Sequence, residues 1–215
     1  ILPVPKGKFP PKIANADKIL RSSCMEEAYR IYGNPLPSKI DARLEKELNS
    51  IIDNGYAVMY VAAQELVKKS LKDGYLVGSR GSVGSSFAAT MAGITEVNPL
   101  EPHYICPKCK KLIWGDMSLY DCGVDMPEIK CPDCGMAMKQ DGFTIPFATF
   151  LGFDGDKEPD IDLNFAGEYQ SIAHKYVGEI FGEGNVYKAG TVGTVADKTA
   201  YGFVMKFFEA TQRPI

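Results

Sequence analysis

The sequence predicts an α+β protein. Segments with apolar residues at helical spacing are mixed with short apolar runs of strand length, without a regular βαβ alternation. In the run Glu158–Phe165 polar and apolar residues alternate with the period of a half-buried strand. The composition changes over residues 103–140, which hold two Cys-x-x-Cys pairs and are interpreted as an inserted subdomain.

The first quarter of the chain is predicted to be helical after an extended start. Residues 1–15 contain four prolines and should form a linker. A helix should follow from Asp17 and end at Gly33-Asn34-Pro35. A second helix is expected over residues 38–54, where apolar residues recur every three or four positions.

Strands and helices should then alternate up to the insertion. Tyr56–Val61 is a short apolar run and is predicted to be a buried strand, followed by a helix over residues 64–71. Tyr75–Val77 should be the next strand. After a turn rich in glycine and serine, residues 86–94 are predicted to form a helix with an Ala/Met apolar face.

After the insertion, residues 147–153 are apolar and aromatic and lead into the alternating acidic run. We expect a helix over residues 169–181, a short strand over 185–188 and a further helix over 194–209.

Composition and charge exclude several classes of protein. With 45% hydrophobic and 24% charged residues, the chain resembles an ordinary globular protein. No apolar run approaches the roughly 20 residues that cross a bilayer, so we expect a cytoplasmic protein without membrane contact. The net charge of −3 argues against a polybasic binder of nucleic acids, but a polymerase or nuclease with an acidic metal site remains possible. The start has no Met and no signal layout, which suggests the interior of a longer protein.

The alternating run after Pro159 presents acidic side chains on one face of the predicted strand. Asp160 and Asp162 should project in the same direction, roughly 6–7 Å apart. Two carboxylates this close repel each other unless a cation lies between them or one keeps its proton. Mg²⁺ or Mn²⁺ would suit oxygen ligands and a substrate phosphate. The same alternation also fits an edge strand with a solvated acidic face, so the pattern alone does not decide.

Four of the six cysteines form two pairs typical of metal binding in a reducing compartment. The spacing between the pairs is close to that of a four-cysteine zinc ribbon. Four thiolates would leave no open position, so the zinc would be structural. Gly135 should permit a turn with positive φ after the second pair. Disulfides or inert thiols are the alternative. The predicted ligands are Cys106, Cys109, Cys131 and Cys134.

The glycine- and serine-rich turn at residues 78–86 lies between a predicted strand and a predicted helix. Backbone N–H groups, serine hydroxyls and the helix N-terminus behind them could together cradle a phosphate. Arg80 could add a bidentate contact. The turn matches neither a Walker loop nor a Rossmann fingerprint, and such a loop is as often a plain turn. The candidate nucleotide-binding residues here are Ser79, Arg80, Gly81, Ser82, Gly84 and Ser85.

A phosphate cradle and two carboxylates in one domain are the minimum for nucleotidyl transfer. The turn, the cysteine insertion, the run Pro159–Phe165 and the segment Gly190–Phe203 together resemble the PolC-type DNA polymerase III alpha subunits of bacteria. The resemblance covers nearly the whole chain in order.

The resemblance implies a fold and an activity. The fold would be a polymerase-β-like nucleotidyltransferase palm with a structural zinc insertion, and the activity that of a DNA-directed DNA polymerase. Asp160 and Asp162 would be two of three catalytic aspartates that hold Mg²⁺, with Mn²⁺ possible, and the third would lie beyond this chain. Implied partners are a DNA primer–template, dNTP and replisome proteins such as the sliding clamp. A 3′–5′ exonuclease would belong to other parts of the parent protein.

The implied organisation divides the chain into successive parts. They are a linker (1–15), the first part of the palm (16–102), the zinc insertion (103–140), the second part of the palm (141–189) and the start of the thumb (190–215). An alternative from another class is a zinc-ribbon module that binds protein or nucleic acid without catalysis.

Overall fold

The α+β prediction is confirmed by the computed structural model, which describes residues 11–152, 157–188, 190 and 193–213. The chain divides into two units, with the boundary between Asn185 and Val186. The predicted linker of residues 1–15 lies mostly outside the described residues.

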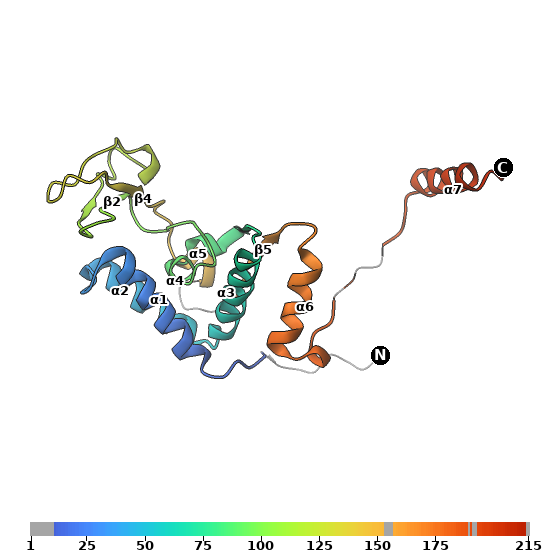
Figure 1. Ribbon diagram of the computed structural model, residues 1–215, viewed down its shortest axis with the longest axis horizontal. Coiled ribbons are helices and arrows are strands. Elements are labelled where there is room, and N and C mark those ends of the chain that lie inside the picture. Colours follow the sequence, from blue (N-terminus) through green and yellow to red (C-terminus); the bar gives the residue numbers. More distant parts are fainter. Residues whose placement is uncertain (1–10, 153–156, 189, 191–192, 214–215) are drawn as a thin grey trace. The chain divides into compact units, whose positions relative to one another are not determined.

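Three long helices, α1 (Ala16–Tyr32), α2 (Ser38–Asp53) and α3 (Ala57–Lys72), open the first unit. Helix α1 packs against α3, and both α1 and α2 contact the short helix α4 (Phe87–Met91) (Figure 1). Helix α2 buries one apolar stripe at helical spacing, which explains both its formation and its orientation. The stripe consists of Ile40, Leu44, Leu48 and Ile51.

The predicted strand at Tyr56–Val61 is wrong, because Tyr56 caps α3 and residues 57–61 form its first turn. Tyr60 and Val61 are buried while Met59 is 37% exposed, so burial follows a helical and not a two-residue period. A short apolar run does not by itself distinguish a buried strand from a buried helix. The helix predicted over residues 64–71 is the second half of α3.

A two-stranded antiparallel sheet joins β1 (Val77–Arg80) to β5 (Asp162–Phe165). The register pairs Val77 with Phe165 and Arg80 with Asp162. The strand predicted at residues 75–77 begins later than expected, at Val77. The acidic strand begins at Asp162, so Asp160 precedes it. The helix predicted over residues 86–94 is shorter, as α4.

The cysteine insertion, residues 103–140, contains most of a separate three-stranded sheet. Strand β2 (His103–Ile105) lies between β3 (Leu112–Trp114) and β4 (Lys139–Asp141). Its buried apolar residues are few, and two of them are cysteines. Its own apolar cluster consists of Tyr104, Cys106, Met126, Cys131 and Met138, while Ile105 packs with the main core.

The insertion leaves and rejoins the helical part of the unit through a hydrogen-bonded stem. Backbone N–H groups of residues 143–145 donate to the carbonyls of residues 98–100 at 2.9–3.0 Å. Gly142 has φ +103, and a Cβ there would meet the Glu101 carbonyl oxygen at 2.2 Å, so only glycine allows this close approach. The two ends of the insertion therefore lie side by side.

Short helices complete the first unit. Residues 147–153, predicted only as apolar and aromatic, contain α5 (Ala148–Leu151), and Phe153 lies outside the described residues. Helix α6 (Gln170–Phe181) agrees with the predicted helix and contacts α3.

The strand predicted over residues 185–188 is not present. Residues Glu183–Asn185 form a short 3-10 helix, and no strand is assigned to residues 186–188. Asn185 closes this turn against the end of α6, because its N–H donates to the Gly182 carbonyl and its Nδ2 to the Phe181 carbonyl. Asn185 is therefore held in a helix-terminating turn.

The second unit contains helix α7 (Asp197–Thr211), close to the predicted helix over residues 194–209. Several of its large apolar side chains are exposed within this unit. They include Tyr201, Phe203, Val204 and Phe207. None of the helices in the described ranges is both long and apolar enough to cross a membrane.

Replacing Leu48 with alanine should lower the free energy of unfolding by about 2–5 kcal/mol, because Leu48 has 0% exposure and its removal leaves a cavity in the core. Leu71→Ala is the matched control, since the same atoms are removed at a position that is 51% exposed. Its effect should stay within about 0.5 kcal/mol. Denaturant unfolding of the isolated chain, followed by circular dichroism, measures both values. If both variants lost the same free energy of unfolding, the burial of the apolar face of α2 would be contradicted.

Candidate functional site

The pairing of β1 with β5 places the glycine- and serine-rich turn, residues 78–86, beside the acidic strand. Arg80 lies opposite Asp162 in the register, and Gly81 follows with φ +83. A Cβ built on Gly81 would lie 3.9 Å from Oδ2 of Asp162. The chain thus passes directly in front of this carboxylate as it leaves β1.

The acidic side chains face solvent because their apolar neighbours face the core. Asp160 and Asp162 are exposed, whereas Ile161 and Leu163 are partly buried against the main apolar cluster. The predicted alternation of burial is therefore confirmed over residues 160–165. Phe165 continues the inward face and stacks on Tyr169, with ring centroids 6.2 Å apart. Burial of the apolar face fixes the outward direction of both carboxylates.

Within the described residues, no group of three or more close histidine, cysteine or acidic side chains includes Asp160 or Asp162. The two carboxylates and the turn remain the predicted catalytic and nucleotide-binding positions. Oxygen ligands of this kind fit Mg²⁺ or Mn²⁺, which keep waters that substrate oxygens can replace.

Several serine hydroxyls of the turn are engaged within the protein. Ser79 donates to Thr95 Oγ1 at 2.7 Å, and Ser85 donates to the Ser82 carbonyl at 2.6 Å. Gly84 is buried, and a Cβ there would press on Val97 at 3.4 Å. The outward face of the turn therefore consists mainly of Arg80, Gly81 and Ser82, which are exposed or half-buried.

The N-terminus of α4, expected to add donors for an anion, is already capped by protein groups. Ser86 Oγ accepts from the Ala89 N–H at 3.2 Å, and the carboxylate of Glu47 accepts from the Ala88 N–H at 3.0 Å. Tyr60 contacts the same Ser86 hydroxyl at 3.0 Å. Donors for a ligand would have to come from the 3-10 helix Gly81–Ser85 and from Arg80.

Glu47 is a buried acid that the sequence analysis missed. It lies on α2 with 0% exposure and forms an ion pair with Arg43, one helical turn earlier. Burial raises the pKa of Glu47, while Arg43 and the donors Ala88 and Ser86 oppose this shift. One signal was available in the sequence, because Glu47 falls on the apolar stripe of α2 next to Leu48.

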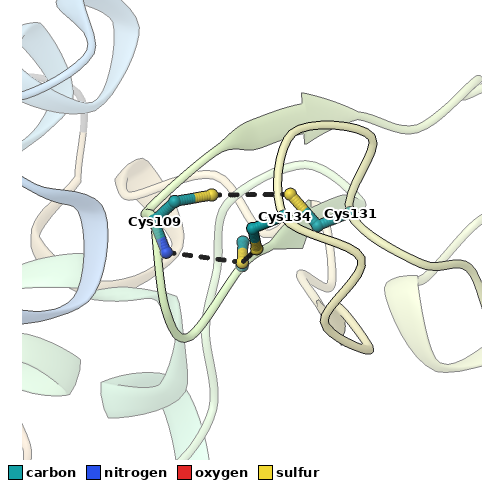
Figure 2. Close-up of side chains that lie close together, drawn as sticks. Cys109, Cys131 and Cys134 are labelled. Carbon is teal, nitrogen blue, oxygen red and sulfur yellow. Dashed lines mark hydrogen bonds between the residues drawn. The ribbon is translucent and has the colours of Figure 1, made fainter.

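The four predicted zinc ligands converge in the cysteine insertion. The Sγ atoms of Cys106, Cys109, Cys131 and Cys134 all lie within 4.8 Å of one another. Two sulfur–sulfur distances are 3.4 Å, between Cys106 and Cys134 and between Cys109 and Cys131. Figure 2 shows the side chains of Cys109, Cys131 and Cys134 drawn together from two separate loops. A zinc tetrathiolate with bonds of about 2.3 Å has sulfur–sulfur edges of about 3.8 Å, so the four sulfurs fit one ion.

Each cysteine pair occupies the same kind of turn. The Cys106 N–H donates to the Lys111 carbonyl, and the Cys131 N–H donates to the Met136 carbonyl five residues on. The residue before that carbonyl has positive φ in both turns: Lys110 in the first and Gly135 in the second, the latter as predicted. The repeated turn aims two sulfurs from each loop at one point.

The clustered thiols differ in their protonation, because hydrogen bonds with neighbouring sulfurs raise the pKa of Cys109 to about 12 and also raise that of Cys134. The backbone N–H of Cys109 points at Sγ of Cys106 at 3.5 Å and lowers the pKa of that thiol to about 6. The thiolate is the form that binds zinc. Cys122 lies outside the group and points at Asp125 Oδ2 at 3.2 Å, while the buried Cys24 points at the Ala88 carbonyl.

The sequence of the chain is similar to those of known proteins. The profile of the family described as bacterial DNA polymerase III alpha NTPase domain matches residues 18–214. A protein named DNA polymerase III PolC-type from Caldanaerobacter subterraneus subsp. tengcongensis is 64% identical over 209 residues, which is 97% of this chain and 15% of that protein. Proteins of the same name from Clostridium perfringens and Thermotoga maritima are 60% and 54% identical, over 97% and 100% of this chain.

The chain spans 14% and 16% of those last two relatives, so it corresponds to a small part of each. These matches confirm the resemblance that the sequence motifs indicated.

We expect the purified chain to carry about one zinc ion, and its removal should unfold residues 103–140 first, because the insertion has a small apolar core that cannot replace the metal. Metal analysis gives the stoichiometry, and hydrogen exchange with and without a chelator locates the loss of structure. Cys109→Ser should lose the ion, whereas the matched variant Cys122→Ser should retain it. Clearly less than one zinc in the unmodified chain would contradict the site.

Proposed function

The chain belongs to the bacterial DNA polymerase III alpha family, and from this premise we propose that it is the palm of a template-directed, PolC-type DNA polymerase. Residues 16–102 and 141–189 would form a nucleotidyltransferase palm of the polymerase-β-like kind. Residues 103–140 would be its structural zinc insertion, and residues 190–215 would begin the thumb.

One observation carries the proposal: the β1–β5 register holds Arg80 and Gly81 beside Asp162. A triphosphate bound along the outward face of the turn would place its phosphates next to the carboxylates. The guanidinium of Arg80 and the backbone N–H groups of Gly81 and Ser82 would balance its charge. A zinc-ribbon module that only binds protein or nucleic acid would not require a phosphate-binding turn beside two carboxylates.

In the reaction, the 3′-hydroxyl oxygen of the primer forms a bond to the α-phosphorus of dNTP, and the bond to pyrophosphate breaks. Asp160 and Asp162 would hold Mg²⁺ or Mn²⁺, which lowers the pKa of the hydroxyl and stabilises charge on the phosphates. The turn would orient the triphosphate for in-line attack. The protein thus contributes mainly positioning and electrostatic stabilisation.

The parent protein would supply what this chain lacks. By family resemblance, a third catalytic aspartate, the fingers and most of the thumb lie outside it. The 3′–5′ exonuclease and the contact with the sliding clamp would also lie elsewhere. The primer–template and dNTP would be shared substrates, with this chain holding the incoming triphosphate.

In the full-length polymerase, Asp160→Asn or Asp162→Asn should lower nucleotide incorporation by at least about a hundredfold while the fold persists. Each change keeps the shape of the side chain and removes the charge that would hold the dication. Steady-state incorporation in Mg²⁺ measures the effect. Asp41→Asn, at an exposed acid on α2, is the control and should remain active. Substantial activity of either site variant would exclude this strand as the catalytic centre.

The isolated 215-residue chain should fold but should not extend a primer, because two carboxylates would hold two catalytic ions only weakly and the missing fingers leave the substrates poorly oriented. Primer extension at high protein concentration, with Mg²⁺ or Mn²⁺, tests this expectation. Template-dependent extension that disappears in the Asp160→Asn chain would show that the site is complete without further residues.

A further inference from the structure

The turn beside Asp162 is held from its inner side by a single carboxylate. Oε2 of Glu47 accepts hydrogen bonds from Ser86 Oγ at 3.1 Å and from the Ala88 N–H at 3.0 Å. Oε1 of Glu47 accepts from Arg43 Nε. Three donors therefore bind this buried acid, and two of them come from the end of the turn and the start of α4.

Arg43 extends the same contact to a second segment. Its Nη2 donates to the Ser85 carbonyl at 3.1 Å and to the Ile145 carbonyl at 3.2 Å. Ile145 belongs to the stem through which the cysteine insertion rejoins the unit. One guanidinium thus links α2, the end of the turn and the stem.

This arrangement is costly if its purpose is stability alone. Removing a carboxylate from water is unfavourable, and well-packed apolar residues commonly stabilise a core as much as a buried ion pair does. An apolar side chain at position 47 would bury the stripe of α2 equally well, but it would leave the Ala88 N–H and the Ser86 hydroxyl without this partner. What the pair adds is a defined position for residues 85–88.

The turn needs such support because the residues of its outward part have little protein packed around them. Arg80 and Gly81 are exposed and Ser82 is half-buried. On the inner side, Gly84 rests on Val97, and the backbone then enters the segment held by Glu47. A shift of Ser85 would be transmitted through three residues to the groups beside Asp162.

We propose that Glu47 and Arg43 are positioning residues for the nucleotide: they hold residues 85–88 from inside, so that Arg80, Gly81 and Ser82 keep the geometry that a triphosphate requires beside Asp162. The inference rests on the proposed function, because it assumes that this turn binds the triphosphate. Both residues would act through the turn and not by contact with the nucleotide, and their effect should therefore appear in nucleotide binding.

The test uses the full-length polymerase with Glu47→Gln. The glutamine oxygen can still accept from Ser86 and Ala88, but its NH₂ group faces the Arg43 donor, so the guanidinium is displaced from Ser85. We expect the KM for dNTP to rise about tenfold, because a shifted turn would no longer present its donors at the positions of the phosphates. The KM for primer–template should change less than about twofold, because under this proposal the pair positions only the turn that binds the nucleotide.

Glu45→Gln is the matched control. It removes the same charge from the same helix, at a carboxylate that contacts Arg21 at 2.6 Å and is 39% exposed. Its kinetic constants should equal those of the unmodified enzyme. Arg43→Lys is the second variant, in case Glu47→Gln folds poorly. The lysine keeps the positive charge but cannot maintain both the Glu47 contact and the two carbonyl contacts, so the KM for dNTP should again rise selectively.

Arg80→Gln distinguishes nucleotide binding by the turn from the positioning role of the pair, because it changes the outward face of the turn directly. If Arg80→Gln raises the KM for dNTP and neither pair variant does, the positioning role is overturned and the proposed function stands. If all three leave it unchanged, the turn does not hold the triphosphate and both proposals fail. If the pair variants lose activity only in proportion to their folded fraction, measured by thermal unfolding, Glu47 and Arg43 are merely structural and the inference is overturned.

Discussion

The antiparallel pairing of β1 with β5 is the contact on which the candidate site depends. The two strands are separated along the chain by the whole cysteine insertion, yet their register places Arg80 opposite Asp162. A two-stranded sheet has little stability of its own. The inward face of β5 is therefore anchored elsewhere: Leu163 packs on the helical core, and Phe165 stacks on Tyr169. The chemistry proposed for the outward face relies on this burial behind it.

Features set by local spacing could be predicted from the sequence. The four cysteines are an example, because two short turns bring each pair together and one ion can join the turns. The alternation around Asp162 is another, since a two-residue period fixes which side chains face the core. Tyr56–Val61 was predicted wrongly because a fully apolar run carries no period, and its helical form is decided by packing against α1.

The inner support of the turn could not be deduced in the same way. Glu47 and Ala88 lie 41 residues apart, so their hydrogen bond exists only once α2 and α4 are packed together. Likewise, the sequence around Ser79 and Ser85 does not show that their hydroxyl groups donate to Thr95 and to the Ser82 carbonyl. Sequence patterns identify groups capable of binding a phosphate, whereas tertiary contacts decide which of those groups still face outward.

The stem formed by residues 98–100 and 143–145 makes the cysteine insertion a side branch of the fold. The hydrogen bonds of the stem hold the two ends of the insertion together. The entropic cost of closing the loop between them rises only slowly with loop length. The branch can therefore be lengthened, shortened or exchanged over evolutionary time without moving β1 relative to β5. Gly142 marks the limit of that freedom, since the junction itself tolerates no side chain.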